Sequence, residues 1–405
     1  MTPAGPDTLE KELAGLARDA DGDGDPEGRV VALLRAHRLL GHAVPRELGG
    51  EGGDLTALAA LAHRIGGASP GAGVLWVMHC QQVAILRDHA PEPLRTRVLR
   101  RVAERQLLLG SVTTEPRKGG HVLTAHAAAR ADGAAVAFRR AAPVVSGGAH
   151  ADAFLLSLRR TEDSAPDDVV LVYADRAQSG ATVLGPLDLM GMRAAGNVAM
   201  EFSGRVPAGQ VIDPEGGFTR ITLRTLAPVG HLGWAACWTG AARRALRQVV
   251  ALLRSGTLTR TDSAYHALAR ARARIDGAEA LVLAALAEHR ARSAPLPGED
   301  PDRAGARLDA PAFQILVNNV KLTVSEETCA AVDALLGLAG LAWGYRRDAG
   351  TDLERLFRDL RAAPLMYGND RLAAASGRLA VMDRAACSFP DTGLDALRTE
   401  GGEVR

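Results

Sequence analysis

The stretch LERLFRDLRAAPLMYGNDR, from Leu353 to Arg371, decides how the rest of the chain is interpreted. Its front half repeats apolar residues at helical spacing while charged residues fill the other face, which predicts an amphipathic helix from Leu353 to Ala363. Pro364 should end this helix, because proline has no backbone N–H and disfavours helical geometry in the residue before it. A short loop that carries Tyr367 therefore follows the helix.

The same stretch resembles the C-terminal signature of the acyl-CoA dehydrogenase superfamily, in which a helix of the form (L/V)ER..RD runs into a loop that carries the catalytic glutamate. In that family the glutamate lies eight residues after the aspartate and removes a proton from the α-carbon of an acyl thioester. Counting eight residues from Asp359 gives Tyr367. The resemblance indicates the scaffold, but the position of the catalytic base holds no carboxylate.

Five further motifs of that family recur in order along the chain. They are VPRELGGEGG (Val44 to Gly53), SVTTEPRKGG (Ser111 to Gly120), VVSGGAHAD (Val144 to Asp152), MGMRAAG (Met190 to Gly196) and RVPAGQVI (Arg205 to Ile212). The chain is therefore similar to the family over nearly its whole length. The resemblance implies the acyl-CoA dehydrogenase fold, with an N-terminal helical domain, a middle β-barrel-like domain and a C-terminal four-helix bundle.

The spacing of apolar residues gives the same order of elements without the motifs. Helical spacing runs to about Arg105, short alternating or β-branched runs follow from Leu107, and long helical stretches return after Gly216. We predict a mainly α protein with one β domain. The predicted domains are residues 1–106 (helical), 107–215 (β) and 216–405 (helical bundle).

Composition excludes several other classes. A chain of 405 residues with 47% hydrophobic content can bury more than one core, and its net charge of +1 gives no argument for binding nucleic acid or an anionic membrane. The acidic N-terminus lacks the basic and then apolar order of a signal peptide, and no apolar run approaches the length of a membrane span, so we expect a cytoplasmic protein. The chain has no Rossmann or P-loop glycine motif.

The four cysteines do not have the spacing of a metal site. Cys80, Cys237, Cys329 and Cys387 lie far apart in apolar helical contexts, which favours buried free thiols over a zinc site. We therefore expect no metal.

The resemblance implies that FAD is the cofactor, and the SVTTEP and VVSGGAHAD motifs supply its proximal contacts. Ser111, Thr113 and Thr114 correspond to residues that hydrogen-bond the ring edge and the ribityl chain, unless the segment is only a polar β turn. Gly119 and Gly120 stand where the family has its Gly-Ser pair.

In the VVSGGAHAD motif, Ser146 corresponds to a threonine whose hydroxyl approaches the reactive nitrogen of the flavin, and Val144 to a tryptophan that packs on the ring. A core strand serine is the alternative for Ser146.

The distal contacts depart further from the family pattern. Arg254 corresponds to an arginine that reaches the pyrophosphate of a partner subunit's cofactor, although a solvated arginine at a helix end is an equal alternative. Gly337 and Gly340 match two glycines that let the backbone approach that cofactor. A shared cofactor site of this kind implies a homodimer or homotetramer.

The family places its base at one of two positions, which here are Tyr367 and, in a rough alignment, Leu223. Neither is acidic, and a phenol with a pKa near about 10 is a poor base at neutral pH. Asp370 is three residues past Tyr367 and could serve as a displaced base, or it could be an exposed loop aspartate.

Three functions remain open on the sequence. The first is a flavoenzyme that acts on an acyl thioester of CoA or a carrier protein with a displaced base, and it leads because most of the superfamily acts on thioesters. The second is a flavin-dependent monooxygenase, which needs no glutamate and whose SGxxHAD wording includes His150; it would need an electron-transfer or flavin-reductase partner. The third is a flavin-binding subunit without catalysis of its own.

Overall fold

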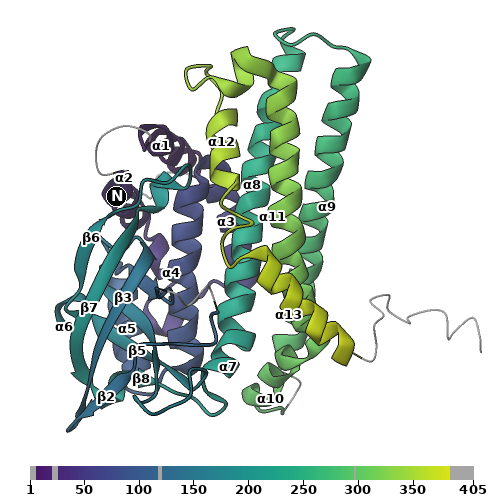
Figure 1. Cartoon of the computed structure of the whole chain (residues 1–405). Helices are drawn as coiled ribbons and strands as arrows, with labels where there is room; N and C mark the ends of the chain where they lie inside the picture. Colours follow the sequence, from purple (N-terminus) through teal and green to yellow (C-terminus); the bar gives the residue numbers. More distant parts are fainter. Residues whose placement is uncertain (1–5, 21–25, 117–120, 296–297, 384–405) are drawn as a thin grey trace, which may run out of the picture.

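The computed structural model describes residues 6–20, 26–116, 121–295 and 298–383. A small β domain lies on one side of the molecule, and long helices form a bundle on the other (Figure 1). The N-terminal helices are α1 (Pro6–Asp19), α2 (Pro26–Ala36), α3 (Leu55–Ala68), α4 (Pro70–His89) and α5 (Leu94–Arg105). Gly119 and Gly120, which were predicted to contact the flavin, lie outside the described residues.

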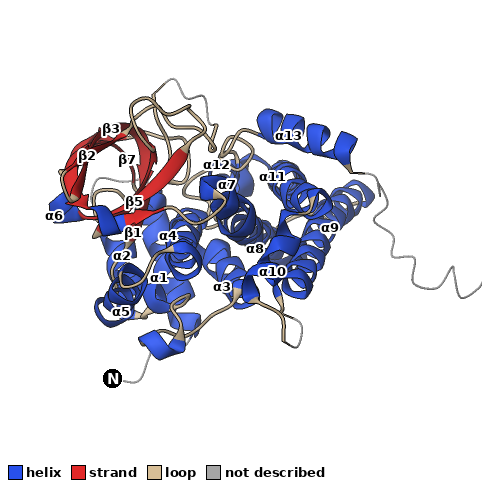
Figure 2. Ribbon diagram, turned by 90° about the horizontal axis from the view of Figure 1, so that it is seen from below, coloured by secondary structure: helices blue, strands red, loops and turns tan. Residues whose placement is uncertain are grey.

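The β domain is built from two four-stranded sheets that curve around one another (Figure 2). Its strands are β1 (Leu109–Val112), β2 (Ala129–Asp132), β3 (Ala135–Ser146), β4 (Ala153–Arg159), β5 (Val169–Asp175), β6 (Thr182–Pro186), β7 (Asn197–Pro207) and β8 (Val211–Ile212), with the short helix α6 (Arg176–Ser179) after β5. One sheet has the order β1-β4-β5-β8, with β1 parallel to β4, and the other has the order β2-β3-β7-β6. Strands β4 and β5 are buried along almost their whole length, which explains their continuous apolar sequences.

The C-terminal part returns to helices. They are α7 (Gly217–Ile221), a π-helical segment (Thr222–Leu226), α8 (Ala227–Arg254), α9 (Asp262–Ser293), α10 (Pro301–Ala306), α11 (Pro311–Gly340), α12 (Leu353–Leu360) and α13 (Asn369–Met382). Helix α12 ends three residues earlier than predicted, because Arg361 and the next residues turn tightly before Pro364. The order of elements is the one predicted, whereas the predicted domain boundaries remain predictions.

Close contacts at glycines pack α8 against α3 and α4. Helices α4 and α8 run antiparallel, and a Cβ added at Gly66 or Gly73 would lie within 2.6 Å of Cys237. A Cβ at Gly240 would lie 1.9 Å from the His63 carbonyl oxygen, and one at Gly233 would lie 2.6 Å from Val77. Gly66 and Gly240 lie against backbone carbonyls, and Gly73 and Gly233 lie against side chains, so a Cβ at any of them would force the helices apart or the side chains to move.

The LERLFRD helix docks on a second motif, the MGMRAAG turn. Asp359 accepts a hydrogen bond from the Met192 backbone N–H at 2.6 Å, and Arg358 donates to the Met190 carbonyl at 2.9 Å. A Cβ on Gly191 would lie 2.3 Å from the Arg358 carbonyl oxygen. These contacts join α12 to the β domain, so the loop after α12 is held against it.

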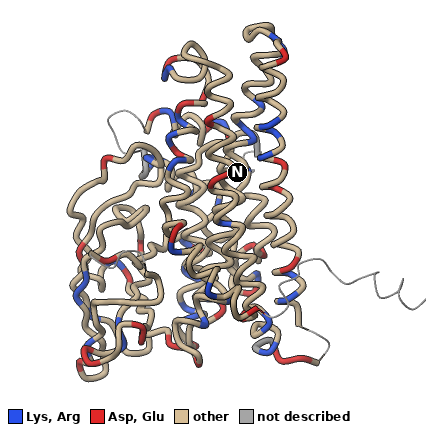
Figure 3. Tube along the Cα trace, turned by 45° about the vertical axis from the view of Figure 1, so that its right-hand side comes forward, with Lys and Arg blue, Asp and Glu red and all other residues tan. Residues whose placement is uncertain are grey.

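Charged residues of both signs are interspersed over the helices and strands in Figure 3. One helical segment, Pro311–Tyr345, is long and apolar enough to cross a membrane by length and composition. It includes α11, which packs against α8, α9 and α13 and buries polar residues such as Gln314 and Lys321, as a bundle helix does. Cys80, Cys237 and Cys329 are buried free thiols, as predicted; Cys387 lies outside the described residues.

Candidate active site

Tyr367 lies in the loop between α12 and α13 with a left-handed backbone, φ 57°. A bulky residue in this region costs on the order of 1–3 kcal/mol and persists only where its surroundings hold it. The ring is held by His231, at 5.7 Å and edge-on, and by Trp234, at 5.4 Å between ring centroids. The side chain of Thr113 shares a hydrogen bond with the phenol.

Tyr367 cannot replace the carboxylate base of the family at neutral pH. Burial raises the pKa of its phenol to about 12, although the hydrogen bond with Thr113 opposes part of this rise. The phenol therefore stays neutral and can donate or accept a hydrogen bond. Leu223, the other position considered for the base, lies half-buried in the π-helical segment, where its carbonyl accepts a hydrogen bond from Gln314 at 2.9 Å.

His231 and Trp234 lie on adjacent turns of α8 and face the Tyr367 ring. Both are buried, and burial lowers the pKa of His231 to about 3, with the positive charge of Lys321 lowering it further and the Val317 carbonyl opposing it. The His231 ring is therefore neutral at physiological pH. Among the described residues, neither ring nitrogen of His231 nor Nε1 of Trp234 has a hydrogen-bond partner of good geometry. These are groups that a bound cofactor or substrate could satisfy.

Lys321 lies behind the Tyr367 loop, fully buried on α11. Its Nζ donates to Oδ1 of Asn369 at 2.6 Å, and the Asn369 amide donates in turn to Ser325 and Glu326 at 3.1 and 2.8 Å. Burial lowers the pKa of Lys321 to about 8, while Glu326 opposes the effect. The sequence has three lysines and 45 arginines, and one of the three lysines is buried here. A buried lysine can lose its proton, whereas an arginine at this position would keep its charge.

The residues assigned to the proximal flavin site lie together at the ends of β1 and β3. Thr113 reaches Tyr367, and Thr114 Oγ1 donates to the Val144 carbonyl at 2.8 Å, which bridges the two strands. Ser111 lies half-buried on β1. Ser146 closes β3 and donates to Oδ1 of Asn197 at 2.7 Å, so its oxygen remains to accept a hydrogen bond.

Glu115 of the SVTTEP motif and the backbone of His150 make contacts within the β domain. Glu115 accepts the backbone N–H groups of His126 and Ala127 at 2.9 and 2.8 Å, beside the buried guanidinium of Arg140. His150 lies in the tight turn after β3, where its backbone N–H donates to the Gly147 carbonyl. The motif letters alone did not separate these supporting roles from ligand contacts.

These residues fit a flavin. Thr113 and Ser146 supply hydroxyl groups, Val144 exposes 38% of an apolar side chain beside them, and the buried His231 and Trp234 nitrogens lack partners within the described chain. A polar edge next to an apolar surface is what an isoalloxazine ring requires. The structure carries no ligand, and we assign no geometry to the ring.

The distal residues lie elsewhere. Arg254 is exposed at the C-terminal end of α8, and Gly337 and Gly340 lie at the far end of α11 with open space at each Cβ position. From Lys321 to Gly337 the helix rises about 24 Å, too far for one chain to place both ends on the same ring. Asp370 is exposed in the first turn of α13.

Comparison with known proteins places this site in a family. The model of the acyl-CoA dehydrogenase N-terminal domain matches residues 6–106, and that of the acyl-CoA dehydrogenase C-terminal domain matches residues 232–369. The chain belongs to the acyl-CoA dehydrogenase superfamily. It is a flavin-dependent oxidoreductase with the acyl-CoA dehydrogenase fold, and a flavin, FAD or FMN, is the cofactor typical of this superfamily.

Two curated members of the superfamily are nitrososynthases. L-evernosamine nitrososynthase of Micromonospora sp. is 30% identical over 95% of this chain and 92% of its own. The amino sugar nitrososynthase DnmZ of Streptomyces peucetius is 29% identical over 90% of each chain. Among solved structures, KijD3 in complex with dTDP has a TM-score of 0.76 and 25% identity, covering 93% of this chain and 94% of its own.

The fold itself is common in the superfamily. FMN-bound TdsC from Paenibacillus sp. A11-2 has a TM-score of 0.79 at 20% identity, covering 95% of this chain and 97% of its own. Butyryl-CoA dehydrogenase from Megasphaera elsdenii has a TM-score of 0.73 at 17% identity, covering 92% of this chain and 98% of its own. These two likenesses show the fold alone.

Among the described residues, no group of three or more His, Cys, Asp or Glu side chains could hold a metal ion. Sequence reasoning missed His231, Trp234, Lys321 and Asn369. Their shared signal was the position of α8 and α11 around the Tyr367 loop, which apolar spacing does not resolve.

Proposed function

We propose that the protein is a flavin-dependent N-oxygenase that oxidises the amino group of a nucleotide-linked amino sugar. FAD is the proposed cofactor, and a separate reductase would supply its electrons. The observation that carries the proposal is Tyr367: the position of the thioester base holds a neutral phenol that is packed between His231 and Trp234 and bonded to Thr113. The names of the two nitrososynthase relatives and the dTDP complex support the choice of substrate.

An amine must carry a free lone pair before it can accept oxygen, and the site favours that form without a carboxylate. The same burial and the same Lys321 charge that lower the pKa of His231 also lower the pKa of an amine placed beside it. His231 is neutral and can accept a hydrogen bond from the substrate, while Trp234 excludes water. Tyr367 and Thr113 then orient the substrate.

The proposed reaction balances with molecular oxygen as the oxidant. The reduced flavin, when bound, would supply the two electrons that each round of oxygen activation requires. In the first round the amine, O₂, two electrons and two protons give a hydroxylamine and water. In the second, the hydroxylamine, O₂, two electrons and two protons give a nitroso group and two waters.

The test compares the two substrate classes on one preparation. Purified protein with FAD, a flavin reductase, NADH and air should convert a dTDP-linked amino sugar into products whose mass shows added oxygen. The same protein, mixed anaerobically with a panel of acyl-CoAs, should keep its flavin oxidised. Bleaching of the flavin by an acyl-CoA would return the lead to thioester dehydrogenation, and flavin binding with neither reaction would favour a non-catalytic subunit.

The same proposal includes a homodimer or homotetramer in which Arg254, Gly337 and Gly340 contact the cofactor of the neighbouring subunit, since Gly337 lies about 24 Å along α11 from Lys321, which lies behind the Tyr367 loop.

A further inference from the structure

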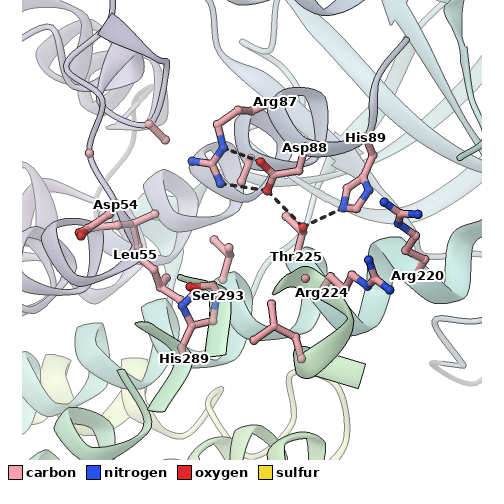
Figure 4. A pocket seen from close by; sticks show the side chains of 17 residues that line it. Asp54, Leu55, Arg87, Asp88, His89, Arg220, Arg224, Thr225, His289 and Ser293 are labelled. Carbon is pink, nitrogen blue, oxygen red and sulfur yellow. Dashed lines mark hydrogen bonds and ion pairs between the residues drawn. The ribbon is translucent and has the colours of Figure 1, made fainter. Parts of the chain in front are cut away.

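A cavity of about 470 Å³ lies beyond the flavin site, where the C-terminal ends of α4 and α9 meet α7 and the π-helical segment (Figure 4). None of Tyr367, Thr113 or Ser146 lines it. Its titratable and charged lining residues are Asp54, Arg87, Asp88, His89, Arg220, Arg224 and His289. The volume is typical of a small-molecule site and exceeds what a single phosphate fills.

Two guanidinium groups, those of Arg220 and Arg224, lie beside His89, and that of Arg87 lies on the other side of Asp88 (Figure 4). Arg87, Arg220 and Arg224 are all close enough to lower the pKa of its imidazole, and Asp88 is the one carboxylate that raises it. Burial is the largest cause, and together they bring the pKa of His89 to about 4.

Two of the arginines are held in place by ion pairs with aspartates. Arg87 donates to both oxygens of Asp88 at 2.6 and 2.9 Å, and Arg224 donates to Asp309 at 2.6 to 3.1 Å. Arg220 lies one turn before Arg224 and faces the same side of His89 in Figure 4. The π-helical segment supplies the wide turn that brings these side chains together.

The remaining acidic and basic groups of the cavity are engaged or neutral. Asp54 caps α3 by accepting the Ala57 backbone N–H at 2.8 Å. The pKa of His289 is lowered to about 4, by burial first, with Arg87 lowering it and Asp88 and Asp54 raising it. His289 therefore adds no charge at neutral pH.

The hydrogen bonds of His89 fix its tautomer. The Thr225 hydroxyl donates to Asp88 at 3.3 Å, so its oxygen accepts from Nε2–H of His89 at 2.8 Å. Nδ1 therefore carries no proton, and within the described part of the chain this buried atom has no hydrogen-bond partner. A buried acceptor without a donor indicates that a ligand or a proton is missing.

We propose that this cavity binds a phosphoryl anion, and that His89 takes one proton from solvent on Nδ1 as the anion binds and donates it in a hydrogen bond to a phosphoryl oxygen. Arg220 and Arg224, which lie beside His89, donate charge-assisted hydrogen bonds to the anion, while Arg87 stays paired with Asp88. The anion site stands on the cavity alone. The anion could be the diphosphate of a nucleotide-linked substrate, an assignment that rests on the proposed function. Free phosphate or pyrophosphate is the other source of the same phosphoryl group.

The test is calorimetric titration of the flavin-loaded protein at pH 6 with inorganic phosphate, pyrophosphate and dTDP, in two buffers that differ in ionisation enthalpy. Arg220→Gln should weaken binding tenfold or more, because a charged hydrogen-bond donor is lost. His89→Asn should take up close to one proton fewer than the parent on binding. The difference between parent and variant cancels any protons that the probe itself takes up. The matched control is Arg130→Gln, which should behave as the parent. Arg130 is exposed on β2 and forms an ion pair with Glu162.

Each outcome decides the proposal. Absence of binding by all three probes, equal affinity of Arg220→Gln, or equal proton uptake by His89→Asn would overturn it. Tighter binding of dTDP than of pyrophosphate assigns the site to a nucleotide, and equal binding assigns it to the free anion. If dTDP binds but no amine is oxidised, the anion site stands and the proposed function fails. If Arg220→Gln oxidises the amine with an unchanged KM and an unchanged dTDP affinity, the proposed function stands and the anion site fails.

Discussion

At the scale of single residues, the position of Tyr367 separates the two enzyme functions. A glutamate at this half-buried position would lie against two aromatic rings beside the Thr113 hydroxyl, where partial loss of solvent favours the protonated carboxyl. We expect Tyr367→Glu to create no acyl-CoA-dependent flavin reduction, measured by anaerobic absorbance. Asp370→Asn should leave amine oxidation unchanged, because the carboxylate is exposed on α13. A loss of turnover in Asp370→Asn would show that this aspartate is the displaced base.

Thr114 carries a second prediction at this scale. Its hydroxyl donates to the Val144 carbonyl in an exposed hydrogen bond, so Thr114→Val removes a bridge between the end of β1 and β3 and should lower the free energy of unfolding by about 0.5–1.5 kcal/mol, with and without flavin. Thr114→Ser keeps the hydroxyl and should be nearly neutral. The measurement is urea denaturation of both forms of the protein. A variant that unfolds normally but binds FAD up to a hundredfold more weakly would show direct contact with the cofactor instead.

At the scale of elements, α11 buries a polar stripe toward α8, and Lys321 is its charged member. Its pKa of about 8 lies below the value near about 10.4 of an unfolded lysine, so the unfolded state holds more protons between these two values. The contribution of Lys321 to stability should therefore rise from pH 8 to pH 10, by at most ~3 kcal/mol, whereas burial of the Cys80 and Cys237 thiols, which raises their pKa values, acts in the opposite direction. Lys321→Met should lack this rise, and Lys11→Met on the exposed face of α1 should keep it. Urea midpoints at pH 7, 8, 9 and 10 measure it.

The elements themselves were predictable, and their contacts largely were not. Apolar spacing placed α4 and α5 to within a few residues, because burial repeats along a helix. It could not show that β1 pairs parallel to β4, or that His231 and Trp234 close over Tyr367, since these contacts depend on how α8 packs. The motif at Ser111 predicted flavin contacts, and these remain predictions; it could not show the hydrogen bond between Thr113 and Tyr367, which joins residues 254 positions apart.

At the scale of the whole molecule, an apolar surface lies at the far end of the bundle. Leu341 and Tyr345 are 72% and 68% exposed beside Gly340, and such surfaces mark association sites. We expect a homodimer or homotetramer in solution, with α11 near an interface. Leu341→Lys combined with Tyr345→Lys should weaken assembly and release flavin, measured by light scattering and absorbance, whereas Leu184→Lys on β6 should not. A monomer that keeps its full complement of FAD would refute the shared site.

Buried histidines set the acid limit of the whole fold. His79 and His231 are buried, and their pKa values fall to about 4 and about 3, mainly because burial disfavours the charged ring. An unfolded histidine titrates near about 6.5, so between pH 6.5 and 4 the unfolded state binds more protons than the folded state and stability falls as pH falls. Each such histidine contributes at most about 1.4 kcal/mol per pH unit.

The carboxylates extend the same trend at lower pH. Arginine partners and hydrogen bonds hold the pKa of Asp352 and Glu279 near about 2 against the opposing effect of burial, so their stabilisation is lost only as pH falls below about 4.5. Thermal unfolding should therefore begin to shift downward near pH 6.5, well above the carboxylate range. His231→Phe, which cannot take up a proton, should flatten the part of the slope between pH 6.5 and 4. A midpoint that stays constant down to pH 5 in the parent would mean that these rings accept protons in the folded state.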